Sequence, residues 1–149
     1  MYPVPDVLAY LAGAWRVERT VRDLSGESDG CFTGRTDFEP LDGGGLLHHE
    51  SGTFVWQGVA RPAGRILRFL PAQPGEDGGT GTSQVQFADG RFFHGLDLRS
   101  GHHIADHPCG ADLYRGEFEA WGPDGWRSIW RVGGPAKQLL LTTEYTRER

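Results

Sequence analysis

Alternation of apolar and polar residues runs along most of the chain and predicts β-strands. The first example places Trp15, Val17 and Val21 on one face. The same alternation, or a short apolar run between turn residues, predicts further strands at 31–38, 46–56, 59–70, 83–88, 91–98, 102–107, 113–121, 126–132 and 137–147. A Pro-Ala-Gly triplet at 62–64 interrupts the fourth predicted strand and favours two short pieces there. The pattern therefore predicts about ten strands.

Glycine and proline separate the predicted strands. The chain holds 23 glycines and 9 prolines, and Asp89-Gly90 is a strong two-residue hairpin signal, whereas Ser100-Gly101 is a weaker one. Residues 71–82, with two prolines and four glycines, predict an exposed loop. One short helix is expected at 7–11, where Asp6 caps its first turn.

The strand count predicts an all-β fold. An open sheet of this size normally curls or closes, and closure removes the exposed edges. The sequence shows no internal repeat or change of composition, so residues 1–149 are expected to form a single domain. We expect one antiparallel up-and-down β-barrel of about 8–10 strands, lipocalin-like, after a short N-terminal helix or turn.

Composition narrows the possible partners. A formal net charge of −5 disfavours binding to nucleic acid and to anionic membranes. The N-terminus lacks the segments of a signal peptide and no apolar stretch is long enough to span a bilayer, so a cytoplasmic monomer or homodimer without a cofactor is expected. Cys31 and Cys109 are expected as free thiols, and a disulfide between them is the alternative.

The segment Gly13-Ala14-Trp15 resembles the GxW opening of the calycin superfamily, which includes lipocalins and fatty-acid-binding proteins. The resemblance implies that Trp15 plugs the closed end of a barrel and that Arg147, near the end of the last strand, covers it. A guanidinium over an indole ring is a cation–π contact.

The chain also resembles an uncharacterised family of short bacterial proteins, a domain of unknown function. The residues that carry this resemblance are 89–94, 107–114, 130–132, Gly134, Pro135 and Lys137. It implies a fold and a recurring set of residues, and no activity. Haem-binding barrels of the nitrobindin type extend the opening to GxWxGxG and use a late histidine. Here Arg-Val-Glu follows Trp15, and no histidine lies beyond His107.

Two expected hairpins allow a register to be proposed for residues 83–107. A turn at 89–90 places Phe87 opposite Phe92 and Val85 opposite His94. A turn at 100–101 places Leu98 opposite His103, Leu96 opposite Ala105 and His94 opposite His107. The inward face would then carry Val85, Phe87, Phe92, His94, Leu96, Leu98, His103, Ala105 and His107. Phe93 and Ile104 would point outward, which fits them poorly and favours a bulge or a covering loop.

The expected inward histidines are the main candidate site residues. His94 and His107 would lie about 5 Å apart at Cβ. The sequence leaves three roles open for this pair: core packing, polar contact to an organic ligand, and metal ligation. Of His48, His49 and Glu50, one is expected inside. The remaining ligand-binding candidates are His103, Cys109, Tyr114, Trp130, Arg131 and Lys137, with Asp112 a further catalytic candidate beside Tyr114.

Three functions fit this pattern. The first is a barrel that binds a small, largely apolar organic molecule, with a polar patch of His, Cys, Asp and Tyr. The second is a cofactor-independent isomerase or cyclase of a biosynthetic intermediate, with His94 or His107 as general base and Asp112 or Tyr114 assisting. The third is a haem or metal carrier.

Overall fold

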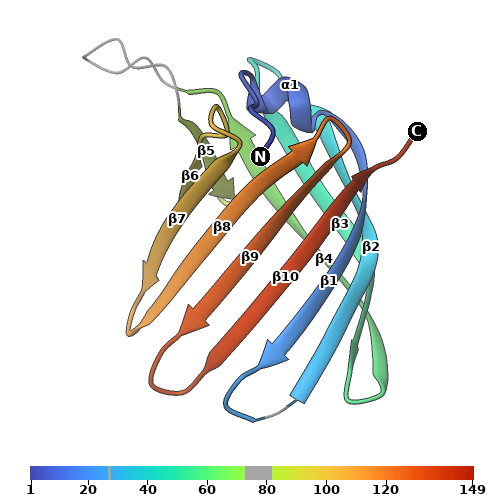
Figure 1. Ribbon diagram of the computed structural model, residues 1–149, viewed down its shortest axis with the longest axis vertical. Helices are drawn as coiled ribbons and strands as arrows, with labels where there is room; N and C mark the ends of the chain where they lie inside the picture. Colours follow the sequence, from blue (N-terminus) through green and yellow to red (C-terminus); the bar gives the residue numbers. More distant parts are fainter. Residues whose placement is uncertain (27, 73–81) are drawn as a thin grey trace.

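The computed structural model describes residues 1–26, 28–72 and 82–149, which form a strongly tilted barrel with one short helix over one end (Figure 1). The helix is α1 (Val7–Leu11), and Asp6 caps it by accepting the N–H of Ala9. Ten strands follow: β1 (Gly13–Asp23), β2 (Ser28–Pro40), β3 (Leu46–Trp56), β4 (Val59–Leu70), β5 (Ser83–Phe87), β6 (Phe92–Leu96), β7 (His102–Cys109), β8 (Asp112–Gly122), β9 (Gly125–Gly133) and β10 (Gln138–Arg147). The all-β, up-and-down antiparallel architecture predicted from the sequence is confirmed.

The ten strands belong to one sheet with the order β6-β5-β4-β3-β2-β1-β10-β9-β8-β7. The first and last strands of the chain are therefore neighbours, and Trp15 lies directly opposite Arg147. β6 and β7 are the two edge strands, and within the described residues no ladder joins them. The barrel is nearly closed, with one seam between β6 and β7.

This seam makes the predicted pairing of residues 91–98 with 102–107 wrong, including the pairs Leu98/His103, Leu96/Ala105 and His94/His107. The turn itself exists, because the N–H of Gly101 donates to the Leu98 carbonyl at 2.8 Å. However, the N-terminal segment occupies this end of the seam: the N–H of Val4 donates to the Leu98 carbonyl at 2.9 Å, and the N–H of Tyr2 donates to the Ala120 carbonyl at 2.8 Å. The N-terminal segment thus takes up backbone groups where a β6–β7 ladder would begin.

The hairpin between β5 and β6 contains an irregularity. Val85 lies opposite His94 as predicted, but Phe92 lies opposite Gln86 and not opposite Phe87. The register shift turns Phe93 inward beside His94, so that Phe93 is 8% exposed and Phe92 is 56% exposed. The predicted orientations of the two phenylalanines were therefore reversed, and the bulge that the sequence left open explains why.

Two further expectations differ from the structure. β4 is one continuous strand, with Pro62 paired to Thr53. β7 runs past the predicted end at residue 107, continues through Pro108 and pairs Cys109 with Asp112. The predicted loop at 71–82 lies mostly outside the described residues. No helix in the described part of the chain has the length and apolar character needed to cross a membrane.

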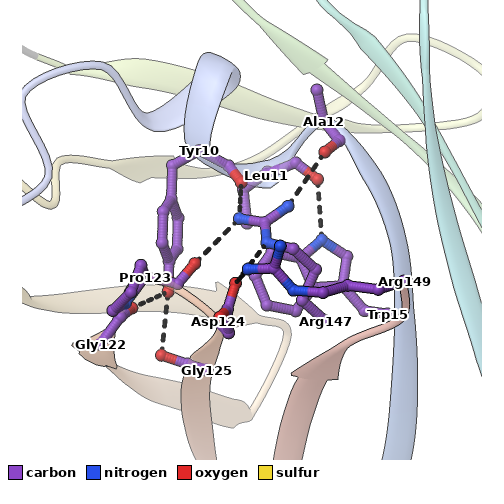
Figure 2. A network of polar contacts seen from close by, with 10 residues as sticks. All are labelled: Tyr10, Leu11, Ala12, Trp15, Gly122, Pro123, Asp124, Gly125, Arg147 and Arg149. Atoms are coloured by element: carbon purple, nitrogen blue, oxygen red, sulfur yellow. Dashed lines mark hydrogen bonds and ion pairs between the residues drawn. The ribbon is translucent and has the colours of Figure 1, made fainter.

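The end of the barrel beneath α1 is filled by Trp15, whose side chain is fully buried and whose indole N–H donates to the Leu11 carbonyl at 2.8 Å. The Arg147 guanidinium lies 4.2 Å from the indole ring centroid, which is the contact that the calycin resemblance implies. Figure 2 shows the same guanidinium donating to the carbonyls of Tyr10, Ala12 and Pro123 and to Asp124. This end of the barrel is therefore closed.

Candidate ligand-binding pocket

A pocket of about 530 Å³ occupies the half of the barrel remote from α1. Its apolar lining consists of Val21, Phe32, Phe54, Ala63, Gly64, Phe87, Phe93, Trp130, Val132 and Leu141. Its polar lining consists of Arg19, Glu50, Arg65, His107, Cys109, Tyr114, Ser128 and Thr143. A largely apolar wall with a few polar groups is the usual composition of a small-molecule site.

A buried ion pair forms the polar centre of this pocket. Arg19 of β1 binds Glu50 of β3 in a bidentate manner, with Nη1–Oε2 at 3.1 Å and Nη2–Oε1 at 2.7 Å. The Arg19 Nε–H also donates to Thr143 at 2.8 Å, and Nη2 lies 3.4 Å from the Tyr145 hydroxyl. The side chains of Arg19 and Glu50 are 12% and 3% exposed. These contacts fix the Arg19 guanidinium inside the barrel.

Arg65 of β4 lies directly across from Glu50 in the ladder, with its Nε 3.7 Å from Oε2. Burial raises the pKa of Glu50, but the hydrogen bonds and charge of Arg19 and the charge of Arg65 outweigh burial and lower it overall. For Arg19, burial lowers the pKa, and its contacts with Tyr145 and Glu50 raise it overall. Both members of the pair are therefore charged at neutral pH.

An aromatic stack forms one wall of the pocket. Phe93 stacks on Trp130 with ring centroids 5.2 Å apart, and it stacks on Phe87 at 4.6 Å. Trp130 lies over Gly116 of the neighbouring strand, where an added Cβ would come within 2.7 Å of the indole ring. Glycine at position 116 is therefore what allows the indole to lie flat against the sheet.

The three candidate histidines occupy different places. His107 lines the pocket, beside Tyr114 at a centroid distance of 6.0 Å. His94 is 4% exposed, its Nδ1 lies 2.7 Å from the Gly95 carbonyl, and burial lowers its pKa to about 4. The Phe93 ring contacts both, at 4.7 Å from His94 and 5.1 Å from His107. His103 Nδ1 accepts the N–H of Asp97 at 3.3 Å in the seam.

A second polar group lies at the rim of the pocket. Lys137 Nζ donates to the Tyr114 hydroxyl at 3.2 Å and lies 3.3 Å from Asp112. These contacts raise the pKa of Lys137. Cys109 lines the pocket next to this group, because it pairs with Asp112 in the ladder, and both Cys109 and Cys31 are free thiols.

The structure brings four predicted ligand-binding residues into the pocket lining: His107, Cys109, Tyr114 and Trp130. Lys137 contacts both Tyr114 and Asp112 at the rim of the pocket. His94 is buried outside the lining, and His103 lies in the seam. Arg131 is exposed on the outer face opposite Arg115. The role of each residue in binding or catalysis stays a prediction.

Sequence reasoning missed the ion pair at the pocket centre. Alternation along β1 was a usable signal, because Arg19 lies between Val17 and Val21 on their inward face. For β3, one inward residue was expected, whereas His48 and Glu50 are both buried and His49 is exposed. Within residues 1–26, 28–72 and 82–149, no group of three or more His, Cys, Asp or Glu side chains is placed to hold a metal ion.

Residues 11–147 match the sequence profile of DUF6314, a family of unknown function. The chain belongs to this family. No curated protein matches the sequence of this DUF6314 chain.

Solved structures share the fold of this DUF6314 barrel at low sequence identity. An S-type phycobiliprotein lyase from Guillardia theta is 7% identical, with a TM-score of 0.68 over 99% of this chain and 94% of the lyase. A DUF3598 protein of unknown function from Nostoc punctiforme is 11% identical, with a TM-score of 0.65. The structural match covers 99% of this chain and 51% of that protein. A de novo designed fluorescence-activating β-barrel is 14% identical, with a TM-score of 0.51 over 97% of this chain and 100% of the design.

Proposed function

We propose that this barrel is a single-domain, calycin-type container that binds a small, largely apolar organic molecule. The observation that carries the proposal is the pocket of about 530 Å³, which has one end closed by Trp15 and a lining of aromatic and aliphatic side chains around a few fixed polar groups. The similarity to a phycobiliprotein lyase and to a fluorescence-activating barrel supports the proposal only through the shared fold.

The free thiols and the net charge of −5 support a cytoplasmic protein whose partner is this small molecule, and not nucleic acid or a membrane surface. The orientation of the ligand follows from the lining. We expect its apolar body to stack on the wall formed by Phe87, Phe93 and Trp130, since aromatic rings gain from offset or edge contacts in addition to burial.

Fluorescence titration with anilinonaphthalene, an apolar dye that brightens when water is excluded, tests the proposal. Leu141 lines the pocket, so Leu141→Trp fills part of it and should weaken dye binding at least tenfold. Leu113 is 48% exposed and outside the lining, so Leu113→Trp is the matched control and should bind like the wild type. Equal dye binding by wild type and Leu141→Trp, or no binding by either, would contradict the proposal.

One observation favours the enzymatic alternative, in which a histidine moves a proton on the bound molecule. His107 lines the pocket beside Tyr114, whereas His94 lies outside the lining and its low pKa makes it a weak base. His107 would then be the general base. Once a natural ligand is identified, the wild type should accelerate deuterium exchange of that ligand in D₂O, and His107→Gln should abolish the acceleration without weakening binding more than a few-fold.

A further inference from the structure

The charges that line the pocket do not cancel. Arg19 and Arg65 are the cations, and Glu50 is the carboxylate among the described lining residues. This count includes only Lys, Arg, Asp and Glu side chains, as does the formal net charge of the chain. Two cations and one anion leave the lining with one net positive charge, within a chain whose formal net charge is −5. The local excess is therefore opposite in sign to the protein as a whole.

The two arginines also keep hydrogen-bond donors available. A guanidinium carries five N–H donors. Arg19 uses one toward Thr143, two toward Glu50 and one toward Tyr145, which leaves one Nη1 N–H unused within the described part of the chain. The Arg65 Nε lies 3.7 Å from Glu50, beyond hydrogen-bond distance, and its side chain is 44% exposed. Arg65 can therefore turn toward a ligand without losing a hydrogen bond to a described residue.

The position of the free Arg19 donor is fixed before any ligand arrives. Glu50 holds Arg19 from one side and Thr143 holds it from another, so the guanidinium cannot swing away. Removing a cation from water without a partner is costly, and an anionic group beside it offsets that cost. Guanidinium groups pair well with the planar or clustered oxygens of carboxylates and sulfonates.

We propose that the pocket selects organic monoanions, with the anionic group bound between Arg65 and the free N–H of Arg19 and the apolar body packed toward Trp130. This inference rests on the proposed binding function and specifies the class of ligand. Glu50 acts here as a positioning residue, because it holds Arg19 in place and cancels one of the two positive charges. A neutral analogue of the same shape leaves the excess charge unpaired and binds more weakly.

A matched pair of probes tests the inference: anilinonaphthalene, which is neutral, and anilinonaphthalene sulfonate, which carries the same rings and one negative charge. Dissociation constants for both are measured on the wild type, on Arg65→Gln and on Arg61→Gln, an exposed arginine of the same strand outside the lining. We expect the wild type to prefer the sulfonate by about tenfold, a preference that corresponds to one favourable charge contact. Arg65→Gln should reduce this preference at least fivefold, mainly by weakening binding of the sulfonate, and Arg61→Gln should change neither dissociation constant.

The outcomes distinguish a failure of the monoanion inference from a failure of the proposed binding function. Equal affinity of the wild type for both probes, or the same loss of preference in Arg61→Gln and Arg65→Gln, would overturn the monoanion inference while the container remains. Failure of both probes to bind would overturn the container and, with it, the inference. Circular dichroism of the two variants shows whether each is folded, and the neutral probe reports whether the pocket is intact in Arg65→Gln.

Discussion

The two ends of the barrel use arginine and tryptophan in opposite ways. At the closed end, Arg147 donates four hydrogen bonds to three carbonyls and Asp124 and lies flat over Trp15, which is fully buried (Figure 2). In the pocket, Arg65 makes one ion contact, at 3.7 Å, among the described residues, and Trp130 is half-buried with one side facing the open space. The same side chains stabilise the fold at the closed end, where Arg147 makes four hydrogen bonds to described residues, and remain available for a ligand in the pocket, where Arg65 makes none.

The difference predicts which substitutions change stability and which change binding. At the closed end, removal of a side chain leaves a cavity and unpaired donors inside the core. In the pocket, space and unpaired donors already exist, so comparable substitutions there should affect ligand affinity more than unfolding. The ion pair of Arg19 and Glu50 lines the pocket but is buried, so it should matter for both stability and binding.

Trp15→Ala should have the largest effect on stability, about 5 kcal/mol, because it removes a fully buried indole and uncovers the Arg147 guanidinium. Urea unfolding followed by circular dichroism measures the loss. Trp121, which is 54% exposed, provides the control, and Trp121→Ala should stay within about 0.5 kcal/mol of the wild type. A loss of less than 1 kcal/mol for Trp15→Ala would show that the closed end is not what holds the barrel together.

Glu50→Ala should cost about 4 kcal/mol, since it leaves the buried Arg19 guanidinium without its partner. The double variant Arg19→Met/Glu50→Met removes both charges and should recover much of this loss, because neither charge then remains buried alone. Glu18→Ala on the exposed face of β1 is the control and should be close to neutral. If the double variant lost as much stability as Arg19→Met and Glu50→Met lose in sum when each is measured singly, the pair would not be coupled as the structure indicates.

Acidification should destabilise the barrel through its buried histidines. The pKa of His94 is lowered from 6.5 to about 4 by burial, so between these values the unfolded chain binds the proton and the folded chain does not. The stabilisation is complete above pH 6.5 and is lost as the pH falls toward 4. His94 accounts for about 3 kcal/mol of this loss, and His48, whose pKa burial lowers to about 3, acts in the same direction.

Unfolding free energies of wild type and His94→Gln, measured from pH 7 to pH 4, test this prediction. The variant should show the smaller decrease. His49→Gln, at an exposed position on β3, should retain the full wild-type pH dependence. Identical pH profiles for wild type and His94→Gln would mean that His94 is not buried as a neutral side chain.

Gly116→Ala should have the smallest effect on stability, about 1 kcal/mol, because the added methyl group pushes Trp130 away from the sheet and toward the pocket. The consequence for binding should be larger, with anilinonaphthalene affinity reduced several-fold as the indole takes up pocket space. Gly122→Ala on the same strand, where an added Cβ meets nothing within 4 Å, is the control. Unchanged dye affinity in Gly116→Ala would place Trp130 outside the binding surface.

Local patterns in the sequence were sufficient for the strands and for the closed end. Alternation and turn residues predicted the ten strands to within a few residues, and the GxW segment with Arg147 implied the contact over Trp15. The seam was not predictable from these patterns, because the backbone of Tyr2 and Val4 competes for positions beside residues about a hundred places later in the chain. The reversed orientation of Phe92 and Phe93 depends on a single extra residue, which alternation alone cannot locate.

The candidate site was only partly predictable for a related reason. His107 and Tyr114 pair across one hairpin, and the sequence named both as candidates, but Pro108 lies between the two predicted strands and alternation alone did not give their register. The triad of Arg19, Glu50 and Arg65 joins three strands, and the Arg19–Glu50 contact reaches over the intervening strand β2, which depends on how the strands are staggered in the barrel.

The most direct test of the container is native mass spectrometry of the wild-type protein and of Leu141→Trp, both purified under mild conditions from the organism that encodes the chain. We expect the wild type to carry one organic molecule per chain, released on denaturation, and Leu141→Trp to carry none. A wild-type protein without any bound molecule, or the same molecule retained equally by Leu141→Trp, would contradict the account.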